Sequence, residues 1–146
     1  MMMKIFKSAG CLGAVLMTIL LSCSCNKNID GSGLPETAQA FLSNYYASVS
    51  VSRVEREFED GSPVYEVYMA NGHEVTFGLD GNWLTVDAPD RTAIPAGIVP
   101  EAIASYLNAN FSGVGVNEID RTSYGYEVDL LNGLDLKFNK DGKRLQ

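Results

Sequence analysis

Residues 65–84 read YEVYMANGHEVTFGLDGNWL, and residues 126–145 read YEVDLLNGLDLKFNKDGKRL. Both stretches alternate apolar and polar side chains, and each contains an Asn-Gly pair followed by an Asp-Gly pair. Alternation with a period of two is typical of strands with one buried face, and both dipeptides are typical of tight turns. The pattern therefore predicts strand, turn, strand, turn, strand, twice.

The alternation also predicts how these strands pair, because directly opposite residues of an antiparallel pair share a face. The apolar residues of the second stretch share one face only if Tyr126 opposes Phe138. That register requires a three-residue loop that ends with Gly133 in the left-handed conformation. The same argument pairs Tyr65 with Phe77 in the first stretch.

The Asp-Gly turns are predicted to be shorter. Phe77 and Leu84 can oppose each other only across an even loop, so residues 80–81 are expected to form a two-residue turn. The second stretch has the same pattern. In this register Trp83 lies opposite Gly78, on the polar face of the sheet.

Residues 1–22 have the pattern of a bacterial lipoprotein signal peptide. Two lysines lie before an apolar run at 11–21 that is too short to span a bilayer comfortably. The run ends in Leu-Leu-Ser-Cys, which resembles a lipobox and predicts acylation of Cys23. An ordinary secretory signal with incidental cysteines is the alternative. The following Ser24 suggests an outer-membrane lipoprotein that faces the periplasm or the cell surface.

Composition excludes several classes of function. Of 11 basic and 18 acidic residues, the signal segment removes two lysines and no acid, which leaves a strongly acidic chain. Such a chain is a poor nucleic-acid ligand, and it can attach to a membrane only through its acyl chains. All three cysteines lie in or beside the signal segment, so no disulfide or zinc site is expected in the folded part. No metal and no cofactor is predicted.

Residues 23–33 are predicted to be a flexible polar tether, and residues 34–146 one domain made of two repeats, 34–87 and 94–146. Each repeat opens with an amphipathic helix that a proline initiates. The valines that follow each helix change from odd to even positions, which predicts a β-bulge. The expected fold class is α+β: two tandem repeats of one helix followed by three to four antiparallel strands, with the helices on one face of the sheet.

A proline-initiated helix followed by Tyr-Glu-Val, Asn-Gly and Phe-x-x-Asp-Gly, duplicated behind a lipobox, resembles the PepSY-like family of secreted proteins. The fold of that family is similar to that of the beta-lactamase inhibitor protein. The resemblance covers residues 34–146 and implies binding or inhibition of an extracytoplasmic protein. Because this sequence lacks the inhibitor's disulfides, no beta-lactamase-contacting residue is carried over.

The polar face of the predicted sheet is the candidate binding surface. Its residues are Trp83, Tyr68, Glu66, Glu74, Thr76 and Thr85. An aromatic side chain among acids is typical of a surface that binds protein or sugar. A tryptophan beside a strand glycine can also simply cover exposed backbone. His73, the only histidine, has no histidine, cysteine or paired-acid partner in the sequence and is expected to be structural.

The predicted function is a non-enzymatic, inhibitor-like binding module that occupies the surface of an unknown extracytoplasmic protein or peptide, with Trp83 and Tyr68 as anchors. One alternative is a small cell-envelope carbohydrate hydrolase that uses Glu66 or Glu127. A glycosidase needs two carboxylates across a cleft, which an open sheet does not offer. The other alternative is a structural lipoprotein whose sheet face packs on itself or on a neighbour.

Overall fold

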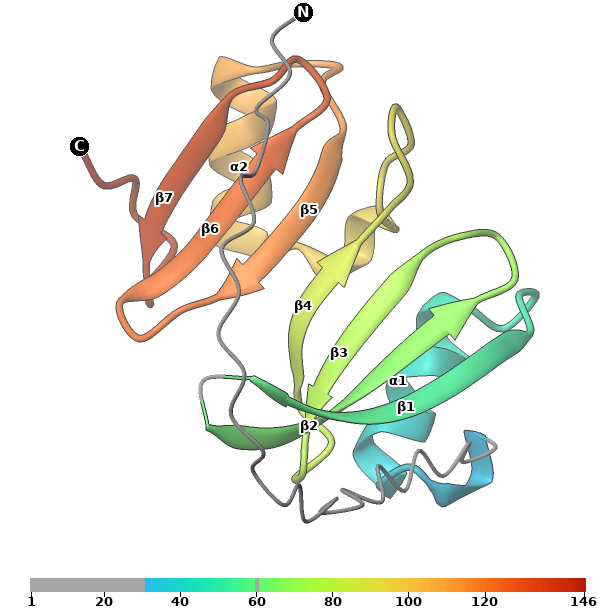
Figure 1. Cartoon of the computed structure of the whole chain (residues 1–146). Helices are drawn as coiled ribbons and strands as arrows, with labels where there is room; N and C mark the ends of the chain where they lie inside the picture. Colours follow the sequence, from blue (N-terminus) through green and yellow to red (C-terminus); the bar gives the residue numbers. More distant parts are fainter. Residues whose placement is uncertain (1–30, 60) are drawn as a thin grey trace, which may run out of the picture.

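The computed structural model describes residues 31–59 and 61–146, which form two α-helices and one seven-stranded antiparallel sheet. Every strand pairs with the next one along the chain, so the sheet order is β1-β2-β3-β4-β5-β6-β7 (Figure 1). The strands are β1 (Val51–Glu59), β2 (Ser62–Met69), β3 (Glu74–Gly78), β4 (Trp83–Asp87), β5 (Val116–Arg121), β6 (Gly125–Leu130) and β7 (Asp135–Asn139). The helices are α1 (Glu36–Tyr45) and α2 (Glu101–Asn110), with 3₁₀ turns η1 (Gly31–Gly33) and η2 (Ala96–Ile98). The predicted α+β class is confirmed.

One row of aliphatic side chains crosses all seven strands on the helix side of the sheet. Its members are Val54, Val67, Val75, Val86, Ile119, Val128 and Leu136. Each lies directly opposite the next, and none is more than 5% exposed. β-Branched side chains fit this pleated surface well, and cross-strand pairs of them stabilise a sheet. Because the row continues from β4 to β5, the strands that follow α1 and those that follow α2 share one core.

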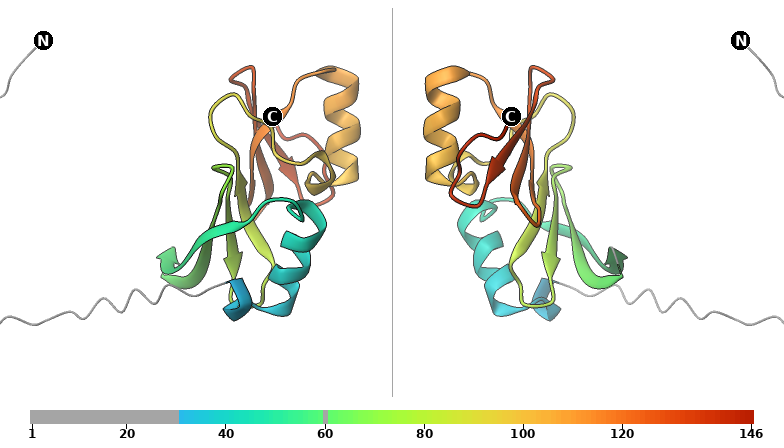
Figure 2. Two further views of the ribbon diagram at one scale, coloured as in Figure 1. Left: turned by 90° about the vertical axis from the view of Figure 1, so that its right-hand side faces the viewer. Right: turned by 90° about the vertical axis from the view of Figure 1, so that its left-hand side faces the viewer.

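Both helices pack on the same face of the sheet (Figure 2). Each has ten residues, which is too short to persist alone in water, so packing must hold it. The rings of Phe41 and Phe77 meet edge-on with centroids 5.5 Å apart, and those of Tyr106 and Phe138 do so at 5.4 Å. The helices therefore lock onto equivalent aromatic positions of β3 and β7.

The predicted Asn-Gly turns are confirmed. Tyr65 opposes Phe77 and Tyr126 opposes Phe138. In the second turn the N–H of Gly133 donates to the carbonyl of Leu130 at 2.8 Å, and the glycine has a φ of 81°. The predicted bulges are also present, at the start of β1 and of β5.

The predicted two-residue Asp-Gly turns are wrong. The N–H of Gly81 donates to the carbonyl of Gly78, and the N–H of Gly78 donates to the carbonyl of Asn82, both at 2.9 Å, so the loop has three residues. An added Cβ on Gly81 would lie 2.8 Å from Pro35, which shows how closely this turn packs against the start of α1. The second turn is alike, since Phe138 bridges to Arg144.

The longer turn is compensated by a bulge in β4, and this changes the face of one residue. Phe77 opposes Trp83 rather than Leu84, and the register shifts before Thr76 opposes Thr85. Trp83 therefore lies on the helix side, where it is 8% exposed and belongs to the core. Its predicted position on the polar face is wrong.

The predicted tether overlaps the described part only at 31–33. These residues form the 3₁₀ turn η1, which lies against β1, so this end of the segment is folded rather than free. The signal segment and Cys23 lie outside the described residues. Within 31–59 and 61–146, no helix has the length and apolar character needed to cross a membrane.

Candidate functional site

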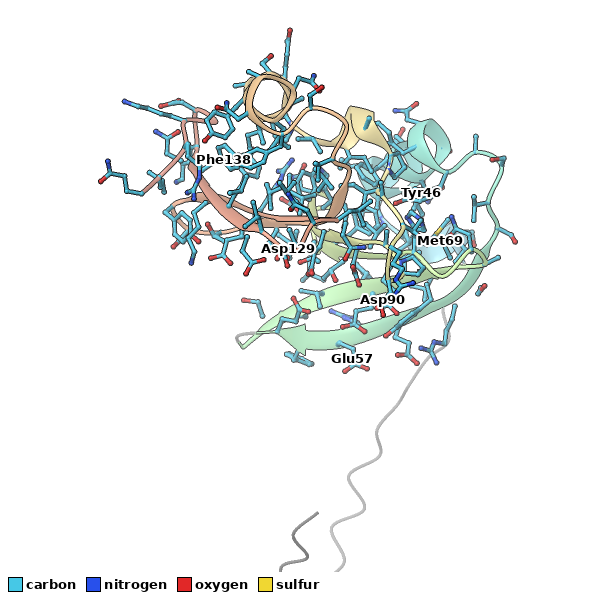
Figure 3. All side chains as sticks on the ribbon, turned by 90° about the horizontal axis from the view of Figure 1, so that it is seen from above. Tyr46, Glu57, Met69, Asp90, Asp129 and Phe138 are labelled. Atoms are coloured by element: carbon cyan, nitrogen blue, oxygen red, sulfur yellow. The ribbon has the colours of Figure 1, made fainter. Side chains whose placement is uncertain are left out.

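The open face of the sheet carries two rows of side chains that flank the central aliphatic row. Along the first row lie Arg53, Tyr68, Glu74, Asp87, Glu118, Asp129 and Asp135. Along the second lie Glu55, Glu66, Thr76, Thr85, Asp120, Glu127 and Lys137. In each row every residue lies directly opposite the next. Figure 3 shows the two sides: Phe138 lies between α2 and the sheet, and Asp129 lies on the opposite side.

The first row contains five carboxylates in succession, from β3 to β7. We call these the carboxylate row: Glu74, Asp87, Glu118, Asp129 and Asp135. Neighbouring strands lie about 4.8 Å apart, so the row extends over about 19 Å. Like charges directly opposite each other destabilise a sheet. The carboxylate row therefore lowers the free energy of unfolding.

Both side-chain ion pairs found on the described open face involve the second row. Arg53 pairs with Glu55 at 3.3 Å, and Lys137 pairs with Glu127 at 3.0 Å. The two cations of these rows thus form their ion pairs with acids outside the carboxylate row.

The environment shifts the pKa values of four members of the carboxylate row upward. Burial, and then the charges of neighbouring acids, raises the pKa of Glu118 to about 7. Burial and then the charge of Asp135 raise the pKa of Asp129, and burial and then the charge of Asp87 raise that of Glu74. Burial also raises the pKa of Asp87. These are the shifts that burial and neighbouring negative charges produce in carboxylates.

Tyr68 marks the end of the carboxylate row on β2. Its hydroxyl donates to Glu66 Oε2 at 2.6 Å, and this bond is the main reason that its pKa rises to about 12. The guanidinium of Arg53 lies 4.0 Å from the ring centroid of Tyr68. A cation thus stacks on this face where an aromatic ring and acids meet.

The open face is concave at the β1–β2 end. The β1–β2 ribbon bends away from the helices, as Figures 2 and 3 show. A hollow of about 410 Å³ lies beside it, lined by Glu59, Ser62, Val64, Leu84, Thr85, Asp120, Arg121, Thr122 and Glu127. Val64 is only 2% exposed although it faces this side, so the hollow has an apolar floor, and its rim is acidic except for Arg121.

Of the six predicted surface residues, five lie in the two rows and one does not. Tyr68, Glu66, Glu74 and Thr85 reach the open face, and Thr76 lies there but is 8% exposed. Trp83 is elsewhere. The guanidinium of Arg121 covers it at 4.0 Å from the ring centroid, and Tyr126 lies 6.4 Å away.

His73 is held inside the fold. It is 5% exposed, and the hydroxyl of Tyr46 lies 3.2 Å from its Nδ1. Burial lowers the pKa of His73. A buried ring with a tyrosine partner fits the structural role expected for it.

The two candidate hydrolase carboxylates are far apart. Glu66 lies on β2 and Glu127 on β6, with three strands between them, which places them about 19 Å apart. Glycosidase pairs lie about 5 to 9.5 Å apart, and one member needs a raised pKa. Hydrogen bonds from Tyr124 and Lys137 instead lower the pKa of Glu127.

Asp87, Glu118 and Asp120 lie on the open face but are not among the predicted surface residues. Their signal is present, because each flanks an aliphatic residue in Thr-Val-Asp at 85–87 or Glu-Ile-Asp at 118–120. Their position on the open face depends on the pairing of β4 with β5. That pairing could not be predicted from a turn motif, because η2 and α2 lie between the two strands.

Carboxylates arranged in a line do not make a compact ligand set. Within 31–59 and 61–146, no group of three or more histidine, cysteine, aspartate or glutamate residues could hold a metal ion. The arrangement suits contact with an extended ligand.

Known proteins place the chain in a family. Residues 63–146 match the model of a family described as beta-lactamase-inhibitor-like, PepSY-like. A solved structure from Bacteroides thetaiotaomicron, described as a calcium-regulated periplasmic protein, is 32% identical with a TM-score of 0.77, and the match covers 83% of this chain and 94% of that one. A structure from Bacteroides vulgatus, described as a periplasmic protein of unknown function, is 30% identical with a TM-score of 0.74, over 80% of this chain and 93% of that one. A second from the same species, described as a periplasmic protein of the DUF2874 family, is 29% identical with a TM-score of 0.77, over 85% and 97%. No curated protein matches the chain significantly.

These matches agree with the fold and with the resemblance drawn from the sequence. The solved relatives are described as periplasmic, which supports an extracytoplasmic location for this chain. The family model covers more than half of the sequence, and the relatives are matched over nearly their whole length. This chain belongs to the PepSY-like family.

Proposed function

We propose that this protein is a non-enzymatic, extracytoplasmic binding module that engages a protein or peptide through the open face of its sheet. The observation that carries the proposal is that both helices cover one face and that nothing in residues 31–59 and 61–146 covers the other (Figure 2). A rigid sheet holds side chains in fixed relative positions, which suits recognition of a partner surface.

Two features of the uncovered face support binding rather than simple solvation. The hollow beside the β1–β2 ribbon combines buried Val64 with an acidic rim, and such hollows accept partner side chains. The carboxylate row keeps like charges opposite each other at a cost to stability, and natural proteins accept such costs mainly at functional sites.

The proposal includes two features that the sequence suggests. One is a lipid anchor at Cys23, which would hold the module at a membrane surface, as an outer-membrane lipoprotein. A Cys23→Ala variant should then lose incorporation of labelled palmitate and move to the soluble fraction. The other is descent from a duplicated unit, supported by two ten-residue helices that each precede a run of antiparallel strands.

Calcium is not part of the proposal, although one solved relative is described as calcium-regulated. Calcium takes six to eight oxygen ligands gathered within about 2.6 Å of the ion. The carboxylate row has one acid per strand instead, and no cluster within the described residues meets the requirement for a metal site. The residues as placed therefore do not fit the ion.

A bulky, uncharged group at the centre of the open face tests the proposal. Thr85 lies on the central strand β4, and Ser105 is exposed on α2, so Thr85→Phe and Ser105→Phe place the same ring on opposite sides. Each variant would be used to capture crosslinked partners from an envelope extract, after thermal unfolding has shown that it folds. We expect Thr85→Phe to lose a stoichiometric partner that Ser105→Phe retains. Loss with Ser105→Phe alone would refute the open face as the site.

A further inference from the structure

We infer that the partner segment bound by the open face is basic: a stretch of polypeptide rich in arginine or lysine that lies along the carboxylate row. This inference rests on the proposed function, because it names the chemistry of the partner at that site.

The charges of the open face are strongly unequal. The two rows together hold nine carboxylates: Glu55, Glu66, Glu74, Asp87, Glu118, Asp120, Glu127, Asp129 and Asp135. They hold two cations, Arg53 and Lys137, and each pairs with an acid of the second row. Complementary potentials determine which partners an interface accepts, so this face selects for positive charge and rejects anionic partners.

The five central carboxylates are placed to gain from a bound cation. Asp87, Glu118 and Asp129 are half-buried on three adjacent strands, where a charge interacts more strongly than it does in water. A guanidinium pairs with a carboxylate through two parallel hydrogen bonds. A partner that brings several guanidinium or ammonium groups would relieve the opposition between neighbouring acids.

The face already contains one small example of this contact. Arg53 stacks on Tyr68 at 4.0 Å, and its charge acts to lower the pKa of Glu74, the first member of the carboxylate row. Arg53 thus lies at one end of the row, and the corresponding position is Tyr68 on β2 and an acid on each strand from β3 to β7. Arginine residues of a partner could repeat the arrangement along the remaining strands.

A polypeptide fits the geometry better than a single ion does. The row is a line about 19 Å long with one acid per strand, and an extended chain covers that length in about six residues. The acids along this line are not gathered into a metal site in the described structure. The hollow, which borders the second row at Thr85, Asp120 and Glu127, could take an apolar side chain of the same segment.

The test uses a fluorescent peptide of about ten residues in which arginine alternates with serine, and an equal peptide with glutamate in place of arginine. We expect the arginine peptide to bind and the glutamate peptide not to bind. Raising NaCl from about 50 mM to about 500 mM should weaken binding, because salt screens these contacts. A Glu118→Gln, Asp129→Asn double variant should raise the dissociation constant at least about tenfold.

A second double variant separates the effect of the carboxylate row on binding from the effect of the protein's net charge. Glu36→Gln with Glu101→Gln removes the same number of charges from the starts of α1 and α2, on the helix side of the sheet. It should change the dissociation constant less than about threefold. The row variant removes two like charges that oppose each other, so it should be at least as stable as the natural chain. Thermal unfolding of the variant can therefore show that any loss of binding is not caused by unfolding.

Four outcomes would overturn the inference. The arginine peptide could fail to bind, or both double variants could weaken binding equally, which would reduce the effect to net charge. Calcium below about 1 mM could stabilise the natural chain but not the row variant and displace the peptide, which would assign the row to a metal ion. Capture of the envelope partner could also be lost with Thr85→Phe and yet be unchanged by salt and by the row variant. The proposed function would then be supported, and the inference that the partner is basic would be refuted.

Discussion

Replacing Glu118 by glutamine should make the protein more stable above neutral pH. Glu118 is the middle member of the carboxylate row, with Asp87 and Asp129 directly opposite it on either side. Glutamine keeps the shape and removes the charge. An unfavourable ionised group is thus exchanged for a neutral one in the same place.

The size of the effect follows from the pKa of Glu118, which rises from 4.5 to about 7 on folding. Between these values the folded state binds more protons than the unfolded state, so the free energy of unfolding falls as the pH rises from 4.5 to about 7. At ~1.4 kcal/mol for each pKa unit, the complete loss would be ~3 kcal/mol. Because Glu118 is only half-buried, solvent screening reduces this, and we expect ~1 kcal/mol.

Urea unfolding at about pH 5 and about pH 8 measures the prediction. Glu118→Gln should be ~1 kcal/mol more stable than the natural chain at the higher pH and nearly equal to it at the lower one. Glu57→Gln is the control, because Glu57 is exposed on β1 and loses the same charge. Its effect should stay within about 0.5 kcal/mol at both pH values. A gain from Glu118→Gln that is equal at both pH values, or equal to that of the control, would refute the reasoning.

Three further predictions concern the helix side and the turns. Arg121→Ala should cost ~0.5–1 kcal/mol and shift the fluorescence of Trp83, the only tryptophan, because it removes the guanidinium that covers that ring. Ala104→Leu should add ~0.5–1 kcal/mol in thermal unfolding, because Ala104 lines a mostly apolar cleft of about 180 Å³ that a larger side chain can fill. Gly81→Ala should lower the free energy of unfolding, measured in urea, by ~1–2 kcal/mol more than Gly133→Ala does. Both glycines have a φ near 80°, but only at Gly81 would an added Cβ collide with other atoms, those of Pro35 and the backbone of Ala38. Equal costs for the two glycines would show that α1 can move away from the turn.

The Asn-Gly turns could be predicted because local rules determine them. Three alternating apolar residues on each side of the turn fix the register, and a glycine in the left-handed position completes the loop. A shift by one residue would expose Val128 and Leu136 together, so few alternatives compete. The structure has this register in both stretches.

The Asp-Gly turns could not be predicted in the same way, because parity assumes an unbroken strand. Because Leu84 is apolar, parity predicts that it opposes Phe77. In the structure β4 has a bulge at this position, and Trp83 opposes Phe77 and is buried in the core instead. The bulge is explained by a tertiary contact of the turn. Gly81 packs against the start of α1, and nothing within residues 77–84 shows that contact.

The acidity of the carboxylate row is a property that the fold does not require. The register that aligns the aliphatic row on the helix side also aligns the residues on the open face, whatever their chemistry. The second row shows the neutral alternative, since Thr76 and Thr85 lie opposite each other between the same two strands that hold Glu74 and Asp87. Threonine favours strands, and a threonine pair stabilises a sheet, whereas a pair of acids opposes it. Folding alone would therefore favour residues such as threonine at these positions, and the carboxylates are better explained by a positively charged partner that compensates for their cost.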